Sequence, residues 1–286
     1  MFAAAFEYHR PKTLAEAVKL LGSVKGARLL AGGHSLLPAM KLRLASPAAL
    51  IDISSIAELS GIKATNDGLQ IGAMTTHAAI AESDVVKKHC PVLAQTAGII
   101  GDQQVRNRGT IGGSVAHADP AADYPTIMLL LGAKFTAANG KERQIEADKF
   151  FVDLFTTSLK QGELLTSIMI PAMSSAASAV YRKHRHPASA FAVVGVGVLL
   201  EVKQGKCADV RIAIGGATAT AVRARAAEAL LTGQAPTVEN IARAAEGVGK
   251  ALDSPISDSY ASGDFRVHLA TVMTRRALTD LAGEAR

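Results

Sequence analysis

Two glycine pairs, Gly32-Gly33 and Gly112-Gly113, constrain the fold most, because a serine follows each pair within two residues. Glycine has no Cβ, so the backbone amides around such a pair can converge closely on an anion. The serine hydroxyl adds one more donor. A single pair is weak evidence, since most Gly-Gly pairs only turn the chain. Two pairs with the same continuation predict a site where backbone amides hold a phosphate diester.

Neither pair belongs to a common nucleotide-binding motif. The G-x-G-x-x-G spacing of the dinucleotide fingerprint is absent from both segments, and no Gly-Lys-Ser or Gly-Lys-Thr follows either pair as it would in a P-loop. The sequence therefore disfavours a classical NAD-binding fold.

The N-terminal segment predicts a small βαβ-like unit. Residues 13–16 (Thr-Leu-Ala-Glu) form a capping box, in which the threonine and glutamate side chains satisfy free amides at the start of a helix. Apolar residues then recur at helical spacing up to Gly22, which can end the helix in the left-handed conformation. Strands are expected at 28–31 and 49–53. The first subdomain is therefore expected to cover residues 1–55.

Hairpin and helix signals alternate in the middle of the chain. Asn66-Asp67-Gly68 lies between two short apolar runs, as in a tight β-hairpin, and Asn139-Gly140 repeats this signal. Pro91 opens a helical pattern between them, because proline is tolerated in the first turn of a helix. A strand is expected at 164–170. Residues 56–172 should form a second subdomain, with the second glycine pair in a turn between two helices.

The last third of the chain predicts a separate domain. Residues 173–179 are mostly small and polar, which suits a linker. Beyond them, 192–202 and 208–214 predict two antiparallel strands, and Ala-rich stretches predict helices. We therefore expect residues 180–286 to form an α+β domain with helices on one face of a sheet.

Composition disfavours nucleic-acid binding and membrane insertion. The 286 residues are about half apolar, which suffices for a sizeable core. The net charge of +6 comes from lysines and arginines spread along a chain without tryptophan, so a stacking platform for single-stranded nucleic acid is poorly supported. No apolar run is long enough for a signal peptide or a transmembrane segment. We expect a cytoplasmic protein.

The cysteines give no sign of a metal centre. Cys90 and Cys207 have no further Cys or paired His at metal-ligand spacing, so neither a zinc site nor an iron-sulfur cluster can be built from them. We expect two reduced thiols and no metal in this chain.

Longer stretches around the glycine pairs resemble a known family. Leu30-Ala-Gly-Gly-His-Ser-Leu-Leu-Pro-Ala-Met-Lys-Leu-Arg43 and Val105-Arg-Asn-Arg-Gly-Thr-Ile-Gly-Gly-Ser114 are similar to the paired flavin motifs in the medium subunit of aerobic carbon monoxide dehydrogenase, a molybdenum hydroxylase of the xanthine dehydrogenase group. The similarity covers nearly the whole chain. It implies an α+β fold class: a vanillyl-alcohol-oxidase-type FAD-binding fold of two α/β subdomains, plus a C-terminal α+β domain with an antiparallel sheet that closes over the isoalloxazine.

The resemblance also implies which residues bind FAD. Asp123 would accept from a cofactor hydroxyl, Leu165 would pack near the cofactor, and the Lys183 ammonium would lie close to it. Phe191 would lie beside the isoalloxazine ring, at a position that is often tyrosine in the family, so a hydroxyl contact is lost here. The two glycine segments would hold the diphosphate through Ala31, Gly32, Gly33, His34, Ser35, Leu36, Thr110, Ile111, Gly112, Gly113 and Ser114.

Some of these residues allow other interpretations. His117, Asp119 and Asp123 lie close in sequence and could be metal ligands of a hydrolase. The alternative is that Asp119 starts a turn and Asp123 alone contacts the cofactor. His34 lies where related flavoproteins sometimes attach the flavin covalently, whereas the resemblance implies noncovalent FAD. The basic run 181–186 could pair with the reduced flavin or a partner subunit, or simply be solvated.

No histidine or carboxylate stands out as a general base, so we nominate no catalytic residue. This agrees with the activity that the resemblance implies, in which FAD accepts electrons from two [2Fe-2S] clusters on a small partner subunit and passes them to quinone, NAD or another acceptor. A large partner subunit with molybdopterin would set the substrate, in a dimer of heterotrimers. The alternatives are a standalone FAD-dependent oxidase or dehydrogenase and a noncatalytic protein that binds anions or nucleic acid.

Overall fold

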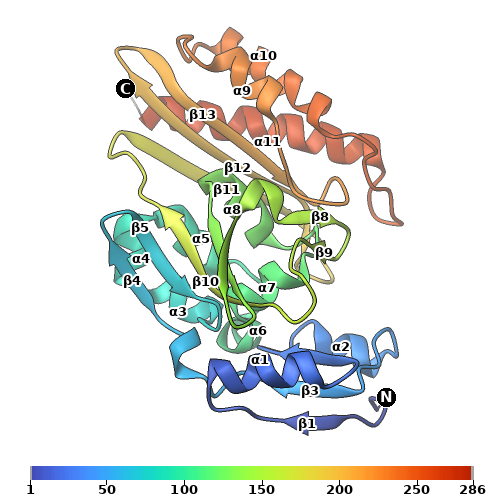
Figure 1. Ribbon diagram of the computed structural model, residues 1–286. Coiled ribbons are helices and arrows are strands. Elements are labelled where there is room, and N and C mark those ends of the chain that lie inside the picture. The colour runs from blue at the N-terminus through green and yellow to red at the C-terminus, as the bar shows by residue number, and fades with distance from the viewer. Residues whose placement is uncertain (1, 285–286) are drawn as a thin grey trace.

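The computed structural model describes residues 2–284 and arranges them from an N-terminal unit at one end to the C-terminal helices at the other (Figure 1). Four sheets organise these described residues, with three, five, four and two strands. Within the described range, no helix is both long and apolar enough to cross a bilayer.

The N-terminal unit is a parallel sheet in the order β1-β3-β2 with two helices. The expected capping box starts its first helix: Thr13 Oγ1 accepts from the Glu16 amide at 3.2 Å, while the Glu16 carboxylate accepts from the Lys12 amide at 2.9 Å. Apolar side chains from the helix and the sheet form a small core of their own. The elements are β1 (Glu7–His9), α1 (Leu14–Ser23), β2 (Ala27–Leu30), α2 (Leu36–Lys41) and β3 (Ala49–Asp52).

The central part is built on a five-stranded antiparallel sheet in the order β4-β5-β10-β6-β7. Its α-helices follow one another between β5 and β6, and the last of them, α8, is buried at every residue. The strands are β4 (Ile62–Thr65), β5 (Gly68–Gly72), β6 (Lys134–Ala138), β7 (Glu142–Glu146), the β8 (Phe151–Asp153) and β9 (Thr156–Thr157) hairpin, and β10 (Leu164–Pro171). The helices are η1 (Ala57–Leu59), α3 (His77–Glu82), α4 (Asp84–His89), α5 (Pro91–Gly98), α6 (Gln103–Arg108), α7 (Ile111–His117), α8 (Asp123–Leu131) and η2 (Ala147–Lys149).

The second glycine pair lies inside helix α7 and not in the expected turn. Thr110 caps this helix by accepting from the Gly113 amide at 3.1 Å. A Cβ on Gly112 would lie 2.6 Å from the carbonyl oxygen of Ala73, so the helix approaches that backbone more closely than a residue with a side chain permits. Capping and close packing here outweigh the low helix propensity of glycine.

The C-terminal part is an antiparallel sheet in the order β11-β12-β13-β14, covered on both faces. Alternate residues of β12, such as Val194 and Val196, join the core formed with the C-terminal helices, whereas Leu199 joins the core that contains α8. Figure 1 shows α8 on one side of this sheet and the C-terminal helices on the other. The elements are β11 (Ala177–Arg185), β12 (Ala192–Lys203), β13 (Lys206–Gly215), β14 (Val222–Arg223), α9 (Arg225–Leu231), α10 (Val238–Glu246), η3 (Gly247–Ala251) and α11 (Gly263–Glu284).

Two sequence expectations differ from this arrangement. The expected linker at 173–179 is shorter, because β11 already begins at Ala177 and pairs with β12. The sheet also carries helices on both faces, since α8 comes from the preceding part of the chain and covers the face that the sequence left open.

Glycines in β12 and β13 let α8 pack directly on the sheet. A Cβ on Gly197 would lie 3.0 Å from Leu130 Cδ2, and one on Gly215 would lie 2.1 Å from Thr126 Oγ1. The absence of side chains at these two glycines leaves the space that α8 occupies, so the helix packs directly against the C-terminal sheet.

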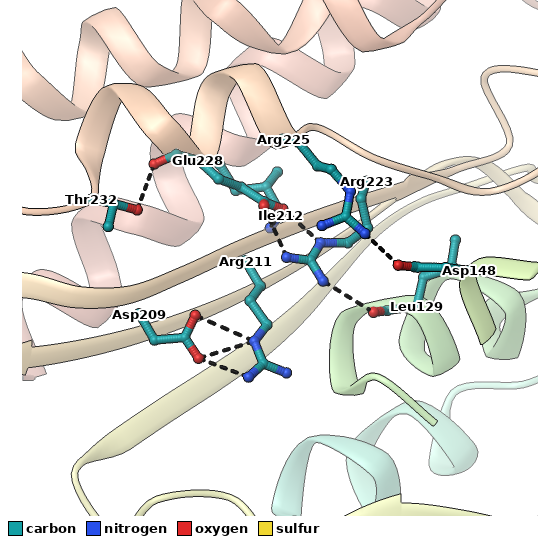
Figure 2. Close-up of polar contacts among 9 residues, drawn as sticks. All are labelled: Leu129, Asp148, Asp209, Arg211, Ile212, Arg223, Arg225, Glu228 and Thr232. Atoms are coloured by element: carbon teal, nitrogen blue, oxygen red, sulfur yellow. Dashed lines mark hydrogen bonds and ion pairs between the residues drawn. The ribbon is translucent and has the colours of Figure 1, made fainter. Parts of the chain in front are cut away.

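Figure 2 shows how the C-terminal part contacts the last turn of α8. Arg223 Nη1 donates to the carbonyl oxygen of Leu129 at 3.4 Å, where helix carbonyls carry partial negative charge. The same guanidinium bonds the Glu228 carboxylate at 2.6 and 2.9 Å, and that carboxylate also accepts from the Ile212 amide at 2.8 Å. More exposed pairs lie around this network: Arg225 with Asp148, and Arg211 with Asp209.

Candidate functional site

The structure brings the two glycine segments into direct contact. A Cβ on Gly32 would lie 2.3 Å from the carbonyl oxygen of Arg108, and a Cβ on Gly113 would lie 3.4 Å from the Cβ of Ala31. Segments about 80 residues apart in sequence therefore meet backbone to backbone at Gly32, where a side chain would overlap the Arg108 carbonyl, and the contact of Gly113 with Ala31 is an ordinary packing contact. The sequence predicted two such segments, and the fold makes them one site.

The first segment keeps its amides free. Within residues 2–284, no backbone amide from 32 to 36 donates a hydrogen bond. Gly33 has φ +77°, a conformation that residues with a side chain rarely adopt, and its carbonyl oxygen accepts from the Leu37 amide at 3.1 Å. His34 and Ser35 are exposed, and His34 Nδ1 lies 2.9 Å from the Gly32 carbonyl oxygen. This turn is an ordered array of free donors ahead of α2.

The amides of residues 111–114 in the second segment donate within the protein. The amides of Ile111 and Gly112 donate to Thr75 and Ala73 at 3.0 and 2.8 Å, and those of Gly113 and Ser114 donate to Thr110 Oγ1 and its carbonyl oxygen at 3.1 and 3.0 Å. The sequence expected these amides to face a ligand, as it also expected of those in the first segment. Their hydrogen bonds instead make this segment a wall that packs against the first segment at Ala31.

Asp123, the first residue of α8, makes a buried polar cluster with strand β11. Its Oδ2 accepts from Lys183 Nζ at 2.8 Å and its Oδ1 accepts from Tyr181 Oη at 2.8 Å. The side chains of Asp123 and Lys183 are only 5% and 4% exposed. Burial raises the pKa of Asp123, while the Lys183 ammonium and the Tyr181 hydroxyl act to lower it.

The remaining residues expected at the site are divided between core and surface. Leu36 is half-buried at the start of α2, and Leu165 on β10 is buried in the central core. Phe191 is 43% exposed, just before β12, in a loop where its carbonyl oxygen accepts from the His186 amide at 2.8 Å. An exposed aromatic ring in a defined loop is available to a ligand, whereas Leu165 contributes chiefly to packing in this structure.

The three residues considered as metal ligands have separate roles. His117 packs on Phe155 with ring centroids 5.1 Å apart, and Asp119 Oδ1 accepts from the Ala121 amide at 2.9 Å, as expected for a turn. In the part of the chain that the structure describes, no three metal-ligating side chains gather. Asp123 belongs to the cluster with Lys183.

Sequence reasoning missed two residues at the site, His77 and Tyr181. His77 is 4% exposed beside Gly109, and burial, helped by the charges of His34 and Arg106, lowers its pKa to about 4. A single histidine in a helical sequence pattern gives no indication of its burial or of its pKa. Tyr181 could have been found, because it lies two residues before Lys183 and strand residues two apart share a face.

Comparisons with known families cover the whole of this arrangement. The family described as the FAD binding domain in molybdopterin dehydrogenase matches residues 4–173, and the CO dehydrogenase flavoprotein C-terminal domain matches residues 171–281. The chain belongs to this flavoprotein family. Its cofactor is FAD, and the free amides of the first glycine segment suit an anionic group such as a diphosphate.

Flavoprotein relatives align along their full length. The carbon monoxide dehydrogenase medium chain of Hydrogenophaga pseudoflava is 39% identical over 281 residues, which is 97% of each chain. The nicotine 6-hydroxylase medium subunit of Paenarthrobacter nicotinovorans is 35% identical, covering 96% of this chain and 97% of the relative. The xanthine dehydrogenase FAD-binding subunit of Escherichia coli O157:H7 is 29% identical, covering 97% and 96%.

Solved structures of the flavoprotein family superpose closely. The structure of carbon monoxide dehydrogenase from Hydrogenophaga pseudoflava that lacks the Mo-pyranopterin moiety matches with a TM-score of 0.96 at 40% identity, over 100% of this chain and 99% of that chain. Quinoline 2-oxidoreductase from Pseudomonas putida 86 matches with a TM-score of 0.94 at 34% identity, again over 100% and 99%. These matches confirm the predicted fold class. The chain is an FAD-binding subunit of the carbon monoxide dehydrogenase and xanthine dehydrogenase type of oxidoreductase.

Proposed function

We propose that this flavoprotein relays electrons in a molybdenum hydroxylase. Its FAD, bound noncovalently, would accept electrons from [2Fe-2S] clusters of a small subunit and deliver them to an external acceptor. The relay role is supported by the relatives, which are medium chains or FAD-binding subunits. The binding of FAD is supported best by the row of free amides at 32–36 against the second glycine segment, because such donors suit an anionic cofactor.

The residues divide the binding of FAD between them. The amides from Gly32 to Leu36 would donate to the diphosphate, and the segment 110–114 would supply the close wall and the Ser114 hydroxyl. Lys183 would place an ammonium beside the cofactor, while the exposed Phe191 would cover the isoalloxazine edge. Leu165 would pack behind it from the core. None of these residues is required to abstract a proton from substrate.

The partners follow from the family. We propose a cytoplasmic complex with a large molybdopterin subunit and the small [2Fe-2S] subunit, assembled as a dimer of heterotrimers. The names of the relatives support a multi-subunit enzyme, since they are medium chains or FAD-binding subunits. The substrate differs among those relatives, so the large subunit would set it.

The test begins with the absorption spectrum of the purified complex and the release of its chromophore by denaturant. We expect about one noncovalent FAD per chain. The isolated chain, reconstituted with FAD, should stay oxidised when given a candidate substrate until the partner subunits are added. Bleaching by substrate alone would favour a standalone oxidase, and a complex without flavin would contradict the proposal.

A substitution then tests the diphosphate grip. Gly33→Val should abolish FAD retention on gel filtration, because valine disfavours φ +77° and its Cβ would lie 2.9 Å from Leu37 Cδ1, which displaces the amides. One lost bond to a charged oxygen already costs about 1.5 to 3 kcal/mol. Gly22→Val is the control, since a Cβ there meets nothing within 4 Å. Stoichiometric FAD in Gly33→Val would refute the assignment.

A further inference from the structure

Tyr181 and Lys183 reach the same carboxylate from one face of strand β11. Both donate to Asp123 at 2.8 Å, each to a different oxygen. All three side chains are nearly removed from solvent, with Tyr181 9% and Asp123 4% exposed. A buried carboxylate needs such donors, and a hydroxyl bond on one oxygen fixes the orientation in which the other oxygen meets the ammonium.

The neighbouring strand is shaped for this tyrosine. Gly195 pairs with Lys183 across β11 and β12. A Cβ on Gly195 would lie 2.2 Å from Tyr181 Oη and 3.0 Å from its Cζ, so the phenol occupies the space that a side chain there would fill. Any other residue at 195 would displace the hydroxyl from Asp123.

The ammonium of Lys183 has donors to spare. It carries three N–H bonds, and in the described part of the chain Asp123 is the one acceptor that they reach. The side chain is 4% exposed, so water is largely excluded from satisfying the others. A buried ammonium with unused donors indicates an acceptor supplied by a bound molecule.

We propose that Tyr181 is a positioning residue, which orients the Lys183 ammonium toward the FAD through Asp123, inside the notch left by Gly195. The inference rests on the proposed function and deepens it. A fixed positive charge favours the more negative, reduced form of the cofactor. The hydrogen bond from Tyr181 also withdraws negative charge from the Asp123 carboxylate. Losing that bond therefore disfavours the reduction of FAD in two ways: the Lys183 ammonium is less ordered, and the Asp123 carboxylate carries more negative charge.

The test is the midpoint potential of FAD in the purified complex, followed by absorption. Tyr181→Phe should lower the ratio of reduced to oxidised FAD at a fixed potential about tenfold, equal to about 30 mV for a two-electron couple. Lys183→Met should lower this ratio of reduced to oxidised FAD further, whereas Lys183→Arg should keep it close to the wild-type value. Asp123→Asn should raise the ratio, because a negative charge is removed. A purely structural defect would not shift the potential in opposite directions.

Tyr8→Phe is the matched control, since Tyr8 Oη also donates to a carboxylate, Asp52, at 2.5 Å in the N-terminal sheet. Gly195→Ala tests the same bond from the other strand and should reproduce the fall in potential, even if Tyr181→Phe is poorly folded. An unchanged potential in Tyr181→Phe, or equal falls in Tyr181→Phe and Tyr8→Phe, would overturn the positioning role. A wild-type complex without FAD would instead overturn the proposed function.

Discussion

His77 shows how the site depends on an uncharged buried group. Its ring lies 5.3 Å from that of Tyr124, and in the described chain its Nδ1 has no hydrogen-bond partner. Gly109 leaves room for it, since a Cβ there would lie 2.6 Å from His77 Nε2. The imidazole therefore packs beside the start of the second glycine segment, where burial favours its neutral form.

This burial predicts a pH dependence of stability. Because the pKa of His77 falls from 6.5 in the unfolded chain to about 4 in the folded chain, its contribution is complete above pH 6.5 and is lost as the pH falls towards 4. Between pH 7 and 5 this loss amounts to about 2 kcal/mol. Urea denaturation of the wild type and His77→Gln at both pH values measures it. An equal loss in both proteins would show that His77 is not the cause.

The residues of the site differed in how well the sequence predicted them. Both glycine pairs were proposed from chemistry alone as diphosphate-binding turns; the first has free amides, whereas the amides of the second are used within α7. Lys183 was placed near the cofactor by resemblance, and the partnership of Tyr181 with Asp123 required the tertiary fold, since the residues are 58 positions apart. His77 could not be predicted, because its environment is made by Gly109 and Tyr124 from other elements.

Helix α8 is held at both of its ends by the C-terminal part. Its first residue, Asp123, bonds Tyr181 and Lys183, and its last turn is bonded by Arg223. Both groups of contacts come from the C-terminal part. The helix is thereby held in register along its length, which fixes the carboxylate of Asp123 relative to the sheet.

Removing Arg223 should loosen this helix. Arg223→Met leaves the Glu228 carboxylate buried without its guanidinium, and breaking such a pair costs about 3 to 5 kcal/mol. The side chains of the pair are 12% and 10% exposed. Urea denaturation should show this loss, whereas Arg225→Met, which breaks a pair that is 63% and 44% exposed, should cost less than about 1 kcal/mol. Comparable losses in the two variants would argue against a special role for Arg223.

Local signals predicted the elements well where capping decides them, as at Thr13 and Pro91. They failed for α7, where the local pattern of two glycines predicts a turn. That helix is stabilised by the backbone of Ala73 and Thr75, which no local pattern contains. The covering of the C-terminal sheet by α8 was missed for the same reason, since it depends on which distant helix packs there.

At the scale of the whole molecule, one core crosses the expected boundary between central and C-terminal parts. Tyr181, Leu199 and Ala213 belong to the same buried cluster as Ile127 and Leu130 of α8. The division into 1–55, 56–172 and 180–286 remains a prediction about folding units. The shared core argues that the last two depend on each other for stability.

A fragment experiment tests this dependence. Residues 171–286 alone should expose the α8-facing side of the sheet, bind a hydrophobic dye and lack a cooperative thermal transition, because that apolar face loses its cover. Co-expression with residues 1–170 should restore a folded protein. A fragment that unfolds cooperatively by itself would show that the C-terminal part is an independent domain.

The free amides at 32–36 have a consequence for selectivity. Backbone donors distinguish charge and shape but not the group attached to the phosphates, so ADP or inorganic pyrophosphate should compete for them. Discrimination in favour of flavin must then come from side chains beyond the turn, such as Phe191 and Lys183 in the C-terminal part. Loading of the subunit in a cell full of adenine nucleotides would then be decided by the C-terminal third of the chain, far in sequence from the amides at 32–36.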